Sequence, residues 1–228
     1  MNYNREKYNR GKLHLVTQPI IYVEGKSNKF FYQQLNELKD KFVDNGGSCI
    51  QIKLKVESQT NSYGIVDHDY QKITHEKLFP INFYSIENIS LIFIRELNNL
   101  KESIINYISE NTLEVVRLYK SHLNICFDTV TKRVTNYNIV LTDQKHHDQY
   151  IEYITRNIIS ESTFMRYKDI KKIVERYVKF LKVKHGVKIN HIIDLAENLP
   201  SKSINDIFDN ETLERFNEVL HSELFTQV

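Results

Sequence analysis

The sequence contains little of what several protein classes require. It has only two cysteines, Cys49 and Cys126, and neither belongs to a Cys-x-x-Cys pair, which excludes a disulfide scaffold and a cysteine metal pair. No apolar run approaches the ~20 residues of a membrane-spanning helix. Residues 1–12 are polar and lack the apolar core of a secretory signal. We therefore expect a cytoplasmic protein that does not enter a membrane.

Glycine and proline are also scarce, with six and three residues, so no flexible Gly/Pro-rich linker separates two independent domains. The 228 residues are 41% hydrophobic and 26% charged, which is typical of a folded globular chain and excludes a disordered one. This length accommodates one large domain, or a core with a helical annex.

The net charge of +2 conceals an uneven distribution. Residues 166–188 contain nine basic and two acidic side chains, whereas residues 189–228 contain two basic and eight acidic ones. A basic stretch of this kind indicates a polyanionic partner such as nucleic acid, or pairing with the acidic tail of another copy. A solvated helix face is the simpler interpretation.

The first part of the chain alternates between strand and helix patterns. Short apolar or alternating runs predict strands at 20–23, 49–54, 63–67 and 79–84, and apolar residues at helical spacing, including Phe30 and Phe31, predict a helix over 27–42. This order predicts an α/β fold with a mainly parallel sheet in residues 1–94.

The rest of the chain, residues 95–228, is expected to be an all-helical C-terminal part. Helical periodicity predicts one helix near 86–93, a second from 113 toward 130, a third at 150–159 and a basic helix at 167–185. Two further helices flank residues 199–201, the last of them at about 211–224. This part is expected to serve substrate contact, partner binding or dimerisation.

Acidic side chains follow two of the predicted strands. Glu24 comes directly after the first strand, and Asp67 and Asp69 follow the strand at 63–67. In open α/β sheets, ligands bind outside the carboxyl ends of the strands. Asp67 and Asp69 share a face in extended chain, and a hard cation such as Mg²⁺ relieves their repulsion. Glu87, in the first turn of the helix that Ser85 is expected to cap, is a further candidate ligand or lies beside one.

Two other motifs resemble functional sites but do not meet their requirements. Gly25, Lys26 and Ser27 resemble the end of a phosphate-binding P-loop, but position 20 is Ile20 where that loop needs glycine. His146, His147 and Asp148 resemble a metal cluster, but adjacent side chains on a helix do not face one point, so we expect a polar turn.

Residues 22–31 (YVEGKSNKFF) and 63–70 (YGIVDHDY) together resemble a Toprim domain. Toprim domains carry Glu-Gly after the first strand and Asp-x-Asp after the third, and they bind Mg²⁺ for phosphodiester chemistry. The residues of these motifs, together with Ser-x-Glu-Asn at 85–88, are similar to those of Toprim nucleases of the OLD group and of AriB-like effectors of the PARIS anti-phage system. The resemblance covers about residues 20–94.

The resemblance implies roles for individual residues. Glu24, Asp67 and Asp69 would hold Mg²⁺ or Mn²⁺, or Glu24 would act as general base. A lysine that stabilises the phosphate would be Lys26, with Lys29, Lys132 and Arg133 as alternatives. The family often has an acidic residue where this chain has Asn28, which favours one metal, or a second metal site built from Glu87. His68 would face away from the carboxylates, toward solvent or a nucleic-acid backbone.

The activity that the resemblance implies is endonucleolytic cleavage of nucleic acid, either RNA such as tRNA or DNA. The chain would be a toxic effector of phage defence, controlled by a separate ATPase partner and active as a homodimer. Its expected substrate contacts are the basic residues Lys171, Lys172, Arg176 and Lys179. The alternative is a catalytically inactive Toprim subunit that binds nucleic acid or regulates a partner, and Asn28 favours it. A module for strand passage or primer synthesis would need further motifs that the sequence does not offer.

Overall fold

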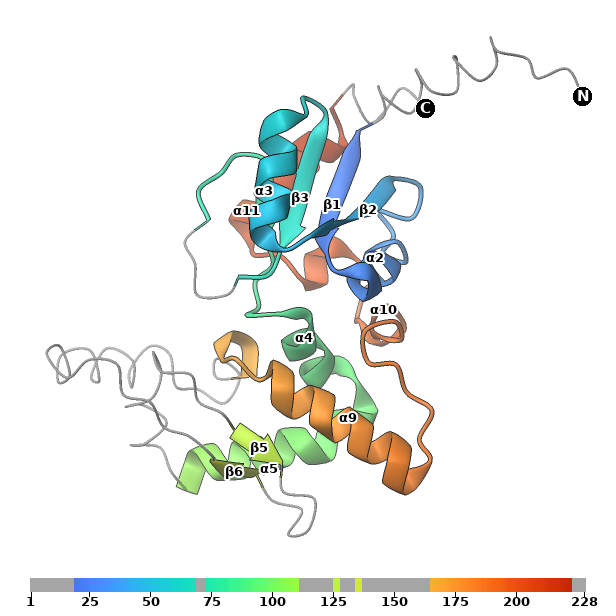
Figure 1. The fold of residues 1–228 in the computed structure, drawn as a ribbon, viewed down its shortest axis with the longest axis vertical. Helices are drawn as coiled ribbons and strands as arrows, with labels where there is room; N and C mark the ends of the chain where they lie inside the picture. The colour runs from blue at the N-terminus through green and yellow to red at the C-terminus, as the bar shows by residue number, and fades with distance from the viewer. Residues whose placement is uncertain (1–18, 69–72, 111–124, 128–133, 137–164, 223–228) are drawn as a thin grey trace, which may run out of the picture. The chain divides into compact units, whose positions relative to one another are not determined.

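The computed structural model of this chain describes residues 19–68, 73–110, 125–127, 134–136 and 165–222 (Figure 1). These residues form two compact units. The first contains the described residues up to Asp67 together with residues 73–81 and 201–222, and the second contains His68 and the described part of residues 82–200.

The first unit is built on a four-stranded parallel sheet. Its strands are β1 (Ile20–Glu24), β2 (Phe42–Gly47), β3 (Ser62–Val66) and β4 (Leu78–Pro80), in the order β2-β1-β3-β4. The central strands form from continuous apolar runs because both of their faces are covered, and Ile21, Val23 and Ile65 are fully buried. The predicted α/β class with a parallel sheet is confirmed.

The region between the first and third strands differs from the prediction. The helix expected over 27–42 is the shorter α2 (Lys26–Tyr32), strand β2 occupies residues 42–47, and the strand expected at 49–54 is the helix α3 (Cys49–Ser58). Ser48 starts α3 with a capping box, in which its backbone N–H donates to Gln51 Oε1 at 2.9 Å. Of the apolar residues that predicted this helix, Phe31 is fully buried and Phe30 is 56% exposed, and Tyr32 is buried as well.

Helix α3 approaches the sheet closely because two strands carry glycine beneath it. Ile52 packs with Tyr22, Val56, Val66 and Leu78 in one buried cluster. A Cβ atom added at Gly46 would lie 2.3 Å from Ile52 Cγ1, and one added at Gly64 would lie 2.4 Å from Ile52 Cγ2. The two glycines therefore leave the space that Ile52 fills.

Replacing Gly64 with alanine is expected to lower the free energy of unfolding by about 1–3 kcal/mol, because the new methyl group overlaps Ile52. In the double variant with Ile52→Ala the overlap with Ile52 disappears and only the 2.7 Å contact with Leu78 Cδ2 remains, so the two losses should not add. Urea unfolding followed by circular dichroism measures both, with the exposed Thr60→Ala as control. Strict additivity of the two losses would contradict this packing.

The chain returns to the sheet near its end, with η2 (Ile204–Asp206) and α11 (Asn210–Leu220). Phe216 of α11 is fully buried, and its ring centroid lies 4.7 Å from that of Phe79 in β4. Leu78, the neighbour of Phe79, belongs to the cluster around Ile52, so α3 and α11 cover opposite faces of the sheet. The predicted last helix is thus confirmed, and it completes the core of the first unit.

Polar contacts also hold residues 201–222 against the rest of the first unit. The Glu37 carboxylate accepts hydrogen bonds from the Ser203 hydroxyl and, at 3.1 Å, from the backbone N–H of Ile204. The Arg215 guanidinium donates to the carbonyl oxygen of Glu76 at 3.1 Å and lies over the Phe79 ring. Residues 201–222 are therefore part of the structure that supports the sheet.

The second unit contains helices and a small hairpin. Its elements are α4 (Ile86–Phe93), η1 (Arg95–Leu97), α5 (Asn98–Glu110), β5 (Ile125–Phe127), β6 (Val134–Asn136), α9 (Lys171–His185) and α10 (Leu195–Asn198). The helices predicted at 86–93, in the basic stretch and before residue 199 are confirmed. Helix α9 ends at Gly186, whose φ of 63° suits glycine.

The expectation of an all-helical C-terminal part is wrong, as is a helix running toward residue 130. Strands β5 and β6 pair in antiparallel fashion, because β-branched and aromatic residues such as Ile125, Phe127 and Val134 suit a pleated strand. The first part of that expected helix and the helix expected at 150–159 lie outside the described residues. The fourth strand is also shorter than expected, at Leu78–Pro80.

The two units do not follow the division expected at residue 94. Residues 82–94 group with the second unit, and residues 201–222 group with the first. Within the described ranges, none of the helices has the length and apolar character needed to cross a membrane.

Candidate functional site

The order of the strands places a topological switch point between β1 and β3. The chain leaves β1 for its neighbour β2 on one side, and then returns to place β3 on the other side of β1. In open α/β sheets, crevices that bind ligands form at such a point, outside the carboxyl ends of the strands. Glu24 is the last residue of β1, and Asp67 directly follows β3. Both acidic residues therefore lie at this end of the sheet.

A hydrogen bond joins the two positions. The backbone N–H of Asp67 donates to Glu24 Oε1 at 2.9 Å, across 43 residues of sequence. Asp67 is only 6% exposed, and Glu24 is half-buried. Two residues predicted to act together are thus adjacent in space, in surroundings where a carboxylate needs partners that balance its charge.

Tyr32 is a neighbour of this pair that the sequence analysis missed. The side chain, at the end of α2, is 1% exposed. Burial raises the pKa of the Tyr32 phenol well above its ordinary value, and the charges of Asp67 and Glu24 raise it further. The phenol therefore stays protonated and can donate a hydrogen bond.

The turn after β1 carries the lysines considered for phosphate contact. Gly25 has a φ of 75° and introduces α2, whose first residue, Lys26, is exposed. Lys29 instead pairs with Asp44 of β2, with 2.9 Å between Nζ and Oδ1. This hydrogen bond lowers the pKa of the Asp44 carboxyl below its ordinary value. Lys26 is therefore the better candidate of the two, and Lys132 and Arg133 lie outside the described residues.

The remaining predicted ligands are not part of this pair in the first unit. Asp69 lies outside the described residues, as do His146, His147 and Asp148. Glu87 is in the first turn of α4, after the N-cap Ser85, and belongs to the second unit. There it opposes the fall in the pKa of His191 that burial causes. Among the described residues, no group of three or more His, Cys, Asp or Glu side chains is placed to hold a metal ion.

His68 also belongs to the second unit. Its ring centroid lies 6.3 Å from that of Tyr167, and its backbone N–H donates to the Phe83 carbonyl oxygen. The half-buried side chain therefore packs beside an aromatic ring, in addition to the solvent contact that we expected.

Helix α9 carries all four predicted substrate-binding residues, three of them exposed and one half-buried. Lys172, Arg176 and Lys179 are exposed and share one face, at the spacing i, i+4 and i+7. Lys171 is half-buried, with its Nζ 5.7 Å from the centre of the Tyr84 ring. Lys168, which contributes to the basic stretch, is 1% exposed, and burial lowers its pKa to about 8. Of the four predicted substrate contacts, Lys172, Arg176 and Lys179 thus form an exposed stripe that can meet a polyanion.

The fold and these side chains define an α/β protein with two acidic residues at the switch point of a parallel sheet. The chain matches no protein-family model, and no curated protein or solved structure is significantly similar to it.

Proposed function

We propose that this chain is a metal-dependent endonuclease that hydrolyses phosphodiester bonds in nucleic acid, either RNA such as tRNA or DNA. The observation that carries the proposal is the hydrogen bond between the Asp67 N–H and the Glu24 carboxylate, at the switch point of the sheet. It brings together the acidic residues of two motifs that are far apart in the sequence. Those two motifs carry the resemblance to Toprim nucleases.

The donor set suits Mg²⁺ or Mn²⁺. In nucleotide-processing sites, Mg²⁺ is bound through one or two carboxylates and completes its shell with water and phosphate oxygens. Glu24 and Asp67 supply two carboxylates of the first unit, and Asp69 and Glu87 are the further ligands that the resemblance implies. When bound, the ion would polarise the phosphate and lower the pKa of a water molecule.

The residues of the chain itself have distinct tasks in this proposal. Glu24 fixes the Asp67 backbone by accepting its N–H, and it can also take a proton from the attacking water as general base. Lys26, exposed beside Gly25, would neutralise the charge that develops on the phosphate. The stripe Lys172, Arg176 and Lys179 would bind the nucleic-acid backbone.

The resemblance supports a cellular role as well. We propose a toxic effector of anti-phage defence in the cytoplasm, active as a homodimer and controlled by a separate ATPase partner. A second candidate is a catalytically inactive subunit that binds nucleic acid or regulates a partner. Asn28 favours it, because a neutral amide replaces the acidic residue that often serves a second metal in the family.

Incubating the purified protein with plasmid DNA, total tRNA and messenger RNA is expected to fragment at least one of them in the presence of Mg²⁺ or Mn²⁺. Gel electrophoresis detects the products, EDTA should prevent them, and the Glu24→Ala variant should not form them. The same variant should remove toxicity on expression. Intact substrates together with harmless expression would overturn the nuclease and favour the inactive subunit.

A further inference from the structure

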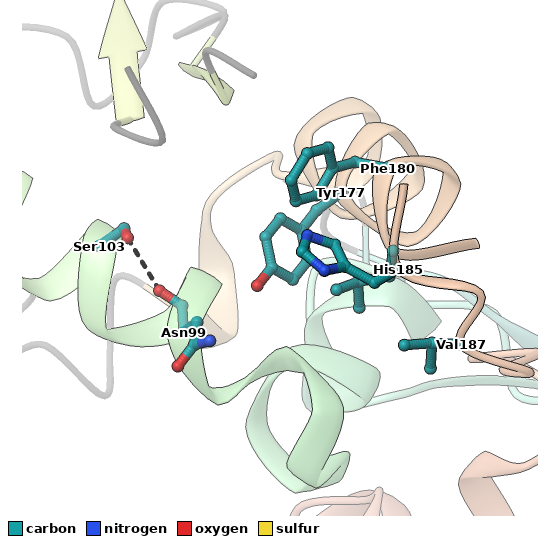
Figure 2. Close-up of a pocket in the computed structure, with 7 residues that line it drawn as sticks. Asn99, Ser103, Tyr177, Phe180, His185 and Val187 are labelled. Atoms are coloured by element: carbon teal, nitrogen blue, oxygen red, sulfur yellow. Dashed lines mark hydrogen bonds between the residues drawn. The ribbon is translucent and has the colours of Figure 1, made fainter. Parts of the chain in front are cut away.

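The second unit contains a pocket of about 350 Å³ between α5 and α9 (Figure 2). Helix α5 contributes Asn99 and Ser103 to its lining, and α9 contributes Tyr177, Phe180 and His185. The volume lies at the small end of the range of ligand pockets, roughly 300–1,000 Å³. Neither the proposed metal site nor the stripe on α9 includes these residues.

Three aromatic rings form one continuous wall of this pocket. The ring centroids of Tyr177 and Phe180 are 5.9 Å apart, and those of Phe180 and His185 are 5.0 Å apart with the planes at 70°. Tyr177 is 3% exposed, Phe180 is half-buried and His185 is exposed. The wall therefore runs from the interior to the surface, and Phe180, in its middle, remains accessible to a flat ligand.

The opposite side of the pocket is polar. Asn99 is exposed near the start of α5 and lines the pocket, and its backbone carbonyl oxygen accepts a hydrogen bond from the Ser103 hydroxyl at 2.8 Å (Figure 2). Burial raises the pKa of the Tyr177 phenol, and a hydrogen bond with the Asn99 side chain opposes this rise. An amide offers both donors and an acceptor, which matches the edge of a nucleobase.

Cations flank the aromatic wall on the same helix. Lys184 follows Phe180 by four residues and Arg176 precedes it by four, so each is a neighbour of Phe180 on the surface of α9. Both side chains are exposed. An aromatic surface with an amide opposite and positive charge on either side suits a base that is still attached to its phosphates.

We propose that this pocket receives one unstacked nucleobase of a single-stranded nucleic acid. Phe180 stacks on the base, Asn99 binds its edge, and Lys184 contacts a flanking phosphate. The inference rests on the proposed function in taking nucleic acid as the substrate, and it adds that the substrate is recognised through an extruded base.

Fluorescence anisotropy with short labelled single-stranded oligonucleotides of A, C or U tests this, in RNA and DNA forms and in EDTA so that nothing is cleaved. Phe180→Leu keeps the apolar volume and removes the stacking ring, and it should weaken binding about tenfold. Lys184→Gln should weaken binding as well, and Asn99→Ala should reduce the preference among the bases. An abasic oligonucleotide of the same length should bind the wild type as weakly as the normal one binds Phe180→Leu.

The controls are Phe42→Leu, at the opposite end of the sheet from Glu24, and Lys39→Gln, exposed in the first unit. Both should bind as the wild type does, and melting curves should show that all variants are folded. Equal binding of normal RNA by Phe180→Leu and the wild type, or equal binding of normal and abasic strands by the wild type, would overturn the base pocket. Cleavage with unaltered Phe180→Leu binding would leave the nuclease standing without this pocket. Base-dependent binding without cleavage would leave the pocket standing without the nuclease.

Discussion

Asp67→Asn is expected to reduce metal-dependent cleavage by about a hundred- to a thousandfold, the effect of removing one well-placed electrostatic group from an active site. Asparagine has nearly the same size as aspartate, and the backbone N–H that donates to Glu24 remains. The variant therefore removes a buried negative charge without removing the contact between the two strands. Initial rates on whichever substrate the wild type fragments provide the measurement.

Glu24→Gln separates charge from structure at the other position. Glutamine still offers an oxygen to the Asp67 N–H, whereas alanine does not, so both variants should lose cleavage but only Glu24→Ala should also lose stability. Mg²⁺ at a hundred times its dissociation constant should stabilise the wild type by about 2.7 kcal/mol and should not stabilise Asp67→Asn. The exposed Asp40→Asn is the matched control. Undiminished cleavage by Asp67→Asn would remove Asp67 from the site.

Phe216→Ala is expected to lower the free energy of unfolding of the first unit by about 3–5 kcal/mol. The Phe216 ring is fully buried, and it packs on Phe79 at 4.7 Å and on Phe208 at 5.3 Å between ring centroids. Alanine would leave a cavity between α11 and the sheet. Hydrogen exchange of the amides in β3 and β4 reports on this unit specifically.

Glu218→Ala is the control for this prediction, because Glu218 is exposed on the same helix and should change stability by no more than about 0.5 kcal/mol. Equal protection of the β3 and β4 amides in Phe216→Ala and the wild type would show that α11 does not support the sheet.

The sequence was informative where burial imposed a simple pattern. Strands β1 and β3 are covered on both faces, so each contains an apolar run, and an acidic residue ends β1 and directly follows β3. That pattern sufficed to predict the α/β class and to choose Glu24 and Asp67. Their proximity follows from the strand order, which the sequence did not specify.

The prediction failed where packing overrode local pattern. Asn45, Gly46 and Gly47 are typical of a turn, but they form the last residues of β2. Gly46 is needed there for packing, since Ile52 fills the space that a side chain at this position would occupy. The alternation over 49–54 is typical of a strand, although Ser48 and Gln51 have the spacing of a helical capping box. Tyr32 could not be assigned to the site, since its role depends on where α2 meets the ends of two strands.

The return of the last helix to the sheet has a consequence for synthesis. The strands that carry Glu24 and Asp67 leave the ribosome early, whereas Phe216, which completes their core, is translated after the whole of the second unit. Cotranslational folding can finish the second unit first, but the first unit must wait for its own C-terminal cover. The proposed cleavage, which needs the carboxylates at the end of this sheet, would then begin only after the chain is released.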